Sequence, residues 1–74
     1  MNAARIALAE LGNRLREVRT AKGWTQAQLA ERVGVSRKTI NTVENRVFVP
    51  STILALKLAL ALEANVETLF FLAE

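Results

Sequence analysis

The 74-residue sequence contains no cysteine and no histidine, and these absences exclude several classes of protein. Without them the chain can form neither disulfide bonds nor a usual zinc site, so a domain this short must gain stability from dense helix packing or from oligomerisation. The sequence also lacks a paired carboxylate cluster and a glycine-rich phosphate loop. We therefore expect no enzymatic activity, no metal and no cofactor.

Long hydrophobic runs are also missing. The longest one, ILALKLALAL at residues 53–62, is interrupted by Lys57 and is about half as long as the roughly 20 residues that a transmembrane helix needs. The N-terminal segment reaches Glu10 before an apolar stretch long enough for export could form. We expect a cytoplasmic protein that does not enter a membrane.

The net charge of +3 is distributed unevenly along the chain. Eight basic and three acidic side chains lie between residues 14 and 46, whereas one basic and three acidic side chains lie between residues 47 and 74. A basic segment favours a polyanionic partner such as nucleic acid. Charge alone would fit a solvated basic surface equally well.

Apolar residues recur at spacings of three and four, and no strand-like alternation is longer than Val47–Val49. The pattern predicts an all-α fold in which five short helices enclose one core, as a single domain over residues 1–74. The first helix is expected to run to about Lys22, with Gly12 as a possible interruption. The N-cap residues expected for the other four helices are Thr25, Ser36, Ser51 and Asn65.

Residues 25–45 have the spacing of two short helices that cross at a steep angle. Gly34 permits a tight turn between them, and the small side chain of Ala30 lets the second helix pass close by. The apolar residues expected to hold the two helices together are Leu29, Val33, Val35, Ile40 and Val43.

The segment RLREVRTAKGWTQAQLAERVGVSRKTINTVEN, residues 14–45, resembles the lambda/434 repressor and Cro family of helix-turn-helix domains. The resemblance extends from about Leu11 to Phe70 and includes the R-x-x-K-G-x-T-Q opening, the G-V-S turn and the E-N pair that ends the second helix of the motif. It implies a lambda-repressor-like fold and a transcriptional regulator that binds double-stranded DNA.

In such a motif the second helix lies in the major groove, and its N-terminal side chains reach the edges of the bases. The residues placed there are Arg37, Lys38, Thr39 and Thr42. The resemblance implies that Arg37, Lys38 and Thr42 read the sequence, and either cation would suit the O6 and N7 acceptors of guanine. The alternative is that Arg37 and Lys38 contact phosphates only.

Phosphate contacts are expected where free backbone amides open a helix and where basic or amide side chains flank the motif. The resemblance supports Gln26 and Asn45 in this role, and it pairs Arg19 with Glu44 as a structural ion pair. The complete set of residues predicted to contact phosphates is Arg14, Gln26, Ser36, Asn45 and Arg46.

The segment after residue 51 is apolar on two sides, which is unusual for a single helix on a small domain. One stripe, formed by Leu54, Leu58, Ala61 and Leu62, must face the core, whereas the opposite stripe needs a cover from residues 1–10 or from another copy of the chain. The family often has glycine in place of Arg46 and polar residues in place of Val47 and Val49. We expect helices in residues 51–72 to supply core and dimer surface, the latter comprising Val47, Phe48, Val49, Ile53, Leu56, Leu60 and Phe71.

These features predict a dimeric repressor whose two recognition helices lie roughly 34 Å apart on a near-palindromic operator. The alternative is an antitoxin-type protein that masks a partner toxin through its second apolar stripe and regulates its own promoter. A partner encoded beside the chain would distinguish the two.

Overall fold

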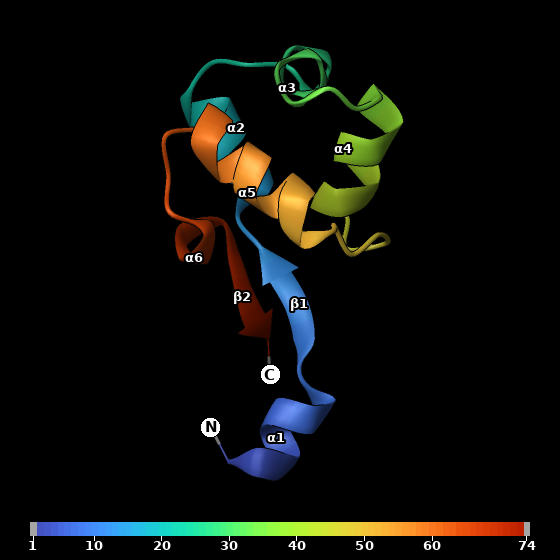
Figure 1. Cartoon of the computed structure of the whole chain (residues 1–74), viewed down its shortest axis with the longest axis vertical. Coiled ribbons are helices and arrows are strands. Elements are labelled where there is room, and N and C mark those ends of the chain that lie inside the picture. Colours follow the sequence, from blue (N-terminus) through green and yellow to red (C-terminus); the bar gives the residue numbers. More distant parts are fainter. Residues whose placement is uncertain (1, 74) are drawn as a thin grey trace.

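Six helices and a two-stranded antiparallel sheet make up residues 2–73, the part of the chain that the computed structural model describes. Helices α2 to α5 form a body, α6 lies at its lower edge, and the sheet projects from it with α1 beyond the far end (Figure 1). Within residues 2–73 no helix is long and apolar enough to span a bilayer. The elements are α1 (Ala3–Leu8), β1 (Glu10–Asn13), α2 (Leu15–Ala21), α3 (Gln26–Val33), α4 (Arg37–Glu44), α5 (Thr52–Ala61), α6 (Val66–Leu69) and β2 (Phe70–Ala73).

Local capping signals set most of the helix boundaries. Thr25 and Gln28 form a reciprocal capping box at the start of α3, and the side chains of Ser36 and Ser51 each accept a backbone hydrogen bond from the first turn of α4 and α5. These three predicted caps are confirmed. The prediction for Asn65 is wrong in part, because it occupies the N-cap position of α6 but its side chain makes no capping hydrogen bond.

The core lies where α2 to α6 meet. The residues predicted to join the two helices of the motif are buried, apart from Val35, which is half-buried. One apolar stripe of α5 also faces inward as predicted, although Ala61 at its margin is only half-buried. The largest side chains that are almost completely enclosed are Leu15, Leu29, Ile40, Val43, Leu58, Leu62 and Leu69.

The prediction of one long N-terminal helix, and with it the count of five helices, is wrong. Strand β1 separates α1 from α2 and pairs with β2, so that Gly12 faces Phe71 across the sheet. The Phe71 ring fills the space above Gly12, where a Cβ atom would lie 2.6 Å from a ring carbon. A side chain at position 12 would therefore displace the ring.

Asn13 joins the sheet to the helical body. Its Nδ2 donates a hydrogen bond to the carbonyl oxygen of Val43 at 2.9 Å, while its Oδ1 accepts one from the backbone amide of Leu15 at 3.1 Å. The amide of Arg14 also donates to the Leu69 carbonyl at 2.8 Å. The strand is thereby fixed both to the end of α4 and to the start of α2.

The C-terminus of α4 closes in a Schellman motif around Arg46. The amide of Arg46 donates to the Val43 carbonyl at 3.0 Å, and the amide of Val47 donates to the Thr42 carbonyl at 2.9 Å. Arg46 itself has a φ of 62°. An arginine here adopts the left-handed conformation for which glycine is better suited.

Candidate nucleic-acid interface

Helices α3 and α4 are joined by a short turn whose backbone is fixed by hydrogen bonds. Gly34 has a φ of 78°, and its amide and that of Val35 both donate to the carbonyl oxygen of Ala30, at 2.9 and 3.0 Å. Ala30 is buried beneath the turn. The turn therefore holds the angle between the helices and leaves the start of α4 at the surface.

The predicted base-reading residues are in two different states. Arg37 and Lys38 are exposed in the first turn of α4, whereas Thr39 and Thr42 are half-buried. The hydroxyl of Thr39 lies 3.0 Å from that of Ser36, and the Thr42 hydroxyl donates to the Thr39 carbonyl at 3.0 Å. Both threonine hydroxyls are thus engaged within α4, and the two cations remain free of such bonds to their own helix.

Sequence reasoning missed Asn41. At 100° per residue it lies on the side of α4 that also carries Arg37, Lys38 and Thr42, and its side chain is half-buried. An asparagine side chain can make two hydrogen bonds to the N6 and N7 atoms of adenine. The one-turn spacing from Arg37 was a usable signal for this residue.

A chain of hydrogen bonds runs from Arg37 to the interior of the domain. Arg37 Nη1 donates to Gln26 Oε1 at 3.1 Å, and Gln26 Nε2 donates to Glu44 Oε1 at 3.0 Å. The predicted ion pair completes this chain, because Arg19 Nε donates to Glu44 Oε2 at 2.6 Å and Nη2 donates to Oε1 at 3.1 Å. The Glu44 carboxylate therefore aligns the exposed Arg37 through the side chain of Gln26.

The Glu44 side chain is fully enclosed and receives hydrogen bonds from three residues. Burial raises the pKa of this carboxyl, but the bonds from Arg19, Gln26 and Arg16 and the positive charge of Arg19 together outweigh burial and lower its pKa below the usual value. Glu44 is thus held as a carboxylate, which accepts all of these donors.

Arg16 was not among the residues predicted to contact phosphates, because the sequence fitted a side chain that only solvates an outer face. Its Nε lies 3.3 Å from Glu44 Oε1, and its Nη2 donates to Asn45 Oδ1 at 3.1 Å. Its side chain is 57% exposed, so it retains surface that could face a phosphate. Only the folded chain brings Arg16 beside the end of α4, because 28 residues separate it from Glu44.

The residues predicted to contact phosphates do not form one group. Gln26 and Ser36 open α3 and α4, with the Ser36 hydroxyl engaged as a cap, and Asn45 is exposed at the end of α4. Arg14 and Arg46 are directed to the sheet instead: the Arg14 guanidinium carbon lies 4.3 Å from the centre of the Phe71 ring, and Arg46 Nη2 lies 3.7 Å from Glu10 Oε2.

The helix-turn-helix family model matches residues 15–74. The chain belongs to this family. The predicted resemblance to repressors of the Cro and lambda type is thereby confirmed.

Two sequence relatives of this helix-turn-helix domain are informative. The uncharacterized HTH-type transcriptional regulator YgzD of Bacillus subtilis is 40% identical over 62 residues, which cover 84% of this chain and 94% of the relative. The antitoxin HipB of Escherichia coli is 42% identical over 36 residues, which cover 49% of this chain and 41% of the antitoxin.

Solved structures share the fold. The restriction-modification controller protein C.AhdI of Aeromonas hydrophila has a TM-score of 0.71 and 42% identity, with 74% of this chain and 83% of the controller covered. The biofilm regulator SinR, solved in complex with DNA, has a TM-score of 0.70 and 28% identity, with 74% of this chain and 89% of that chain covered.

On the helix-turn-helix domain, the apolar residues predicted to form a dimer surface are exposed, with one exception. Val47 and Leu60 are 78% and 82% exposed, and their neighbours on the loop and on α5 are 46–68% exposed. Phe71 differs, because it is half-buried in the sheet between Gly12 and Arg14. The exposed members, hereafter the α5 surface, are Val47, Phe48, Val49, Ile53, Leu56 and Leu60.

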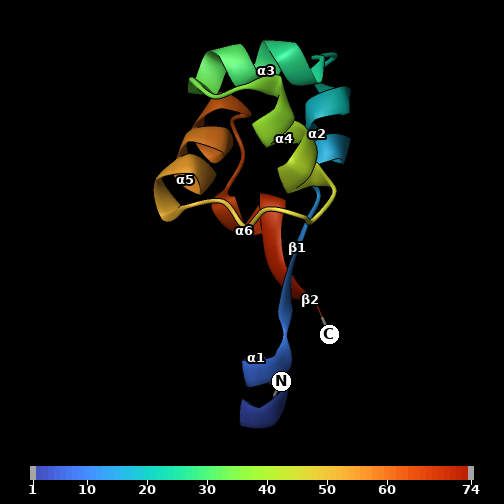
Figure 2. The same ribbon diagram turned by 90° about the vertical axis from the view of Figure 1, so that its right-hand side faces the viewer.

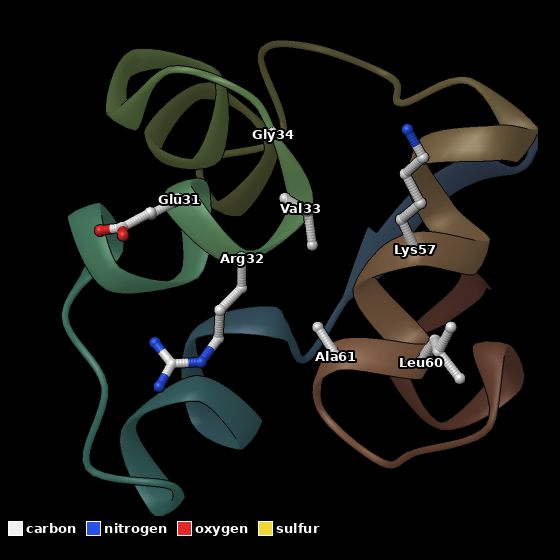
Figure 3. A pocket seen from close by; sticks show the side chains of 7 residues that line it. All are labelled: Glu31, Arg32, Val33, Gly34, Lys57, Leu60 and Ala61. Atoms are coloured by element: carbon white, nitrogen blue, oxygen red, sulfur yellow. The ribbon is translucent and has the colours of Figure 1, made fainter.

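A hollow of about 420 Å³ lies between the end of α3 and the outer side of α5 (Figure 3). Its two cations, Arg32 and Lys57, point in different directions. The Arg32 guanidinium carbon lies 3.9 Å from the centre of the Trp24 ring and is occupied there. The hollow therefore lacks converging polar groups that would bind a small ligand.

Proposed function

We propose that this helix-turn-helix domain is a sequence-specific DNA-binding transcriptional regulator, most simply a repressor, with α4 in the major groove. The observation that carries this proposal is the alignment of the exposed Arg37 by the buried Glu44 through Gln26. Such an arrangement orients a guanidinium before DNA arrives, which reduces the entropy lost on binding. The regulators among its relatives, and SinR with its DNA, support the same function.

Base reading falls to the exposed side of α4. Arg37 and Lys38 have the donors that match the O6 and N7 atoms of guanine, and Asn41 has the amide that matches adenine. Since its hydroxyl is engaged, Thr42 offers its methyl group, which can pack against the methyl of thymine.

Phosphate binding falls to the edge of the same surface. Gln26 opens the eight-residue helix α3, where unpaired backbone amides and the helix dipole favour an anion. Asn45 and Arg16 lie together at the other edge. These contacts would seat α4 without discriminating between sequences.

A homodimer formed through the α5 surface would place two copies of α4 on one side of the DNA. Large apolar side chains that are scattered singly over a surface need no explanation, whereas six of them in one region indicate an interaction surface. A two-fold axis beside this surface gives a near-palindromic operator with half-sites one turn apart, roughly 34 Å.

The test is a binding selection on random DNA with the parent chain, two test variants and one control variant. We expect the parent protein to select a near-palindrome, Lys38→Ala to lose preference at one position in each half-site, and Asn45→Ala, at the exposed end of α4 beside Arg16, to bind all sequences more weakly. Lys22→Ala removes the same charge at a residue paired with the exposed Glu63, away from α4, and serves as the control. Uniform losses for both test variants would contradict the division of roles.

An antitoxin function is the second candidate, and the partial match to HipB is the observation that favours it. In that case the α5 surface would bind a toxin. Co-purification of a neighbouring gene product that competes with self-association would favour this alternative over a free homodimer.

A further inference from the structure

Two hydrogen-bonded branches start at the Glu44 carboxylate and lead to opposite ends of α4. One branch passes through Gln26 to Arg37 in the first turn of the helix. The second passes through Arg16, whose Nε donates to the same carboxylate oxygen, Oε1, at 3.3 Å. Its Nη2 donates to Oδ1 of Asn45, the C-cap residue of α4, at 3.1 Å. The second branch therefore ends at a residue proposed above to bind phosphate.

Arg16 reaches the end of α4 because α2 lies beside it (Figure 2). Arg16 and Arg19 are three positions apart on α2, so both guanidinium groups lie on one side of that helix and meet the Glu44 carboxylate. Arg19 is buried with the carboxylate, whereas Arg16 extends from it to the surface. A guanidinium presents several donors in a rigid plane, which lets Arg16 bond to Glu44 and Asn45 at once.

The Asn45 amide is held in one orientation by its two neighbours. Its Oδ1 accepts from Arg16, and its Nδ2 donates to the backbone carbonyl oxygen of Asn41 at 2.9 Å. Turning the amide over would place donor against donor and acceptor against acceptor, and both bonds would be lost. Within residues 2–73 the second N–H of Nδ2 makes no hydrogen bond. An exposed donor of fixed direction therefore remains for a phosphate.

We propose that Arg16 is a positioning residue, which holds the Asn45 amide with one N–H directed to the DNA backbone. The proposal rests on the DNA binding proposed above and assigns Arg16 its part in it. Without Arg16, an exposed amide at a helix end would sample several rotamers, and DNA binding would have to order it at a loss of entropy. Because both branches start at Glu44 Oε1, one group orients the two ends of α4 together.

The orientation of Asn45 can be tested in the free protein by NMR relaxation of its side-chain amide. We expect the order parameter of Nδ2 to be high in the parent and to fall in Arg16→Met, which keeps the aliphatic stem but has no donor. Lys22→Ala removes a cation of another surface ion pair at the end of α2 and should leave the order parameter unchanged. A parent amide that is already mobile, or one that stays rigid in Arg16→Met, would overturn the proposal.

The role in binding is tested by a double-mutant cycle on the duplex that the parent protein selects from random DNA. We expect Arg16→Met to raise Kd about twofold to tenfold for each copy of the chain on the duplex, the effect of ordering one side chain. In the Asn45→Ala background the same substitution should have little further effect, because no amide remains to be oriented.

Lys22→Ala is the control for lost charge in this cycle, and it should change Kd equally in the parent and in the Asn45→Ala background. Fully additive losses for Arg16→Met and Asn45→Ala would show that Arg16 contacts phosphate on its own, and they would overturn the proposal. An unchanged Kd for Arg16→Met would overturn it as well.

The two proposals fail in different ways. A parent chain that binds no duplex DNA would overturn the proposed function and the positioning role with it. A chain that binds DNA but has a mobile Asn45 amide, or additive losses in the cycle, would overturn only the part assigned to Arg16.

Discussion

The two ends of the helical body are held by different kinds of interaction. Near α4, the enclosed carboxylate of Glu44 receives hydrogen bonds from Arg16, Arg19 and Gln26. At the sheet, the ring of Phe71 occupies the space that Gly12 leaves free. Ion pairing therefore fixes the end that carries the proposed DNA-binding surface, and steric fit fixes the end from which α1 extends. The contribution of the α4 end to stability should therefore depend on charge and pH, and that of the sheet end on the volume of the side chains there.

The largest effect is expected from Glu44→Ala. Arg19 is 8% exposed, so removing its partner leaves a nearly buried cation without compensation and should cost about 3–5 kcal/mol in the free energy of unfolding. Urea denaturation measures this. Glu44→Gln is the matched control for shape, and a loss as small as about 0.5 kcal/mol for Glu44→Ala would show that the ion pair does not hold this end.

The next largest effect is expected at the sheet. Gly12→Ala adds one carbon that would lie 2.6 Å from the Phe71 ring, and moving the ring should cost about 1–3 kcal/mol. The double variant Gly12→Ala with Phe71→Leu provides space for the new methyl and should recover part of the loss. If the single variant is as stable as the parent, close packing does not fix this end.

Position 46 lies between the two ends, and the substitution Arg46→Gly should increase the free energy of unfolding. The left-handed backbone at position 46 costs an arginine about 1 kcal/mol more than it costs glycine, so this variant should be more stable by about that amount. The lost pair with Glu10 is largely exposed and contributes little. Arg46→Ala removes the same side chain but keeps the strain, and any gain it shows would come from another source.

The smallest effect is a response to acid. The pKa of Glu44 is lowered in the folded chain, so its contribution to stability is complete above the unfolded-state value, about 4.3, and is lost as the pH falls through the folded-state value. Unfolding free energies measured between pH 7 and pH 3 should fall less steeply for Glu44→Gln than for the parent. Gly12→Ala should retain the parent's slope, which separates the two ends.

The helices of the motif could be predicted because their signals are local. Thr25 with Gln28, the turn at Gly34 and the cap at Ser36 are all read within a few residues, and each is present in the structure. The sheet could not be predicted in this way. Its strands are four residues each, and Gly12 and Phe71 are 59 positions apart, so neither strand shows its pairing in its own sequence.

The residues of the candidate site also differ in whether local sequence signals reveal them. The exposed positions of Arg37 and Lys38 follow from helical periodicity, and Asn41 could have been found by the same reasoning. The part played by Arg16 could not, because it depends on how α2 packs against the end of α4. The expected pairing of Arg19 with Glu44 came from the family resemblance alone.

The Schellman motif at Arg46 has a consequence for the spacing of operators. Only Asn45 and Arg46 separate the last residue of α4 from Val47, the first residue of the α5 surface, and backbone hydrogen bonds to Thr42 and Val43 fix both amides that follow Asn45. A connection this short and rigid would restrict the proposed dimer to operators with one spacing between the half-sites. One base pair inserted between the half-sites would rotate one half-site against the other by roughly 35°. A rigid connection between α4 and the α5 surface could not adjust to that rotation.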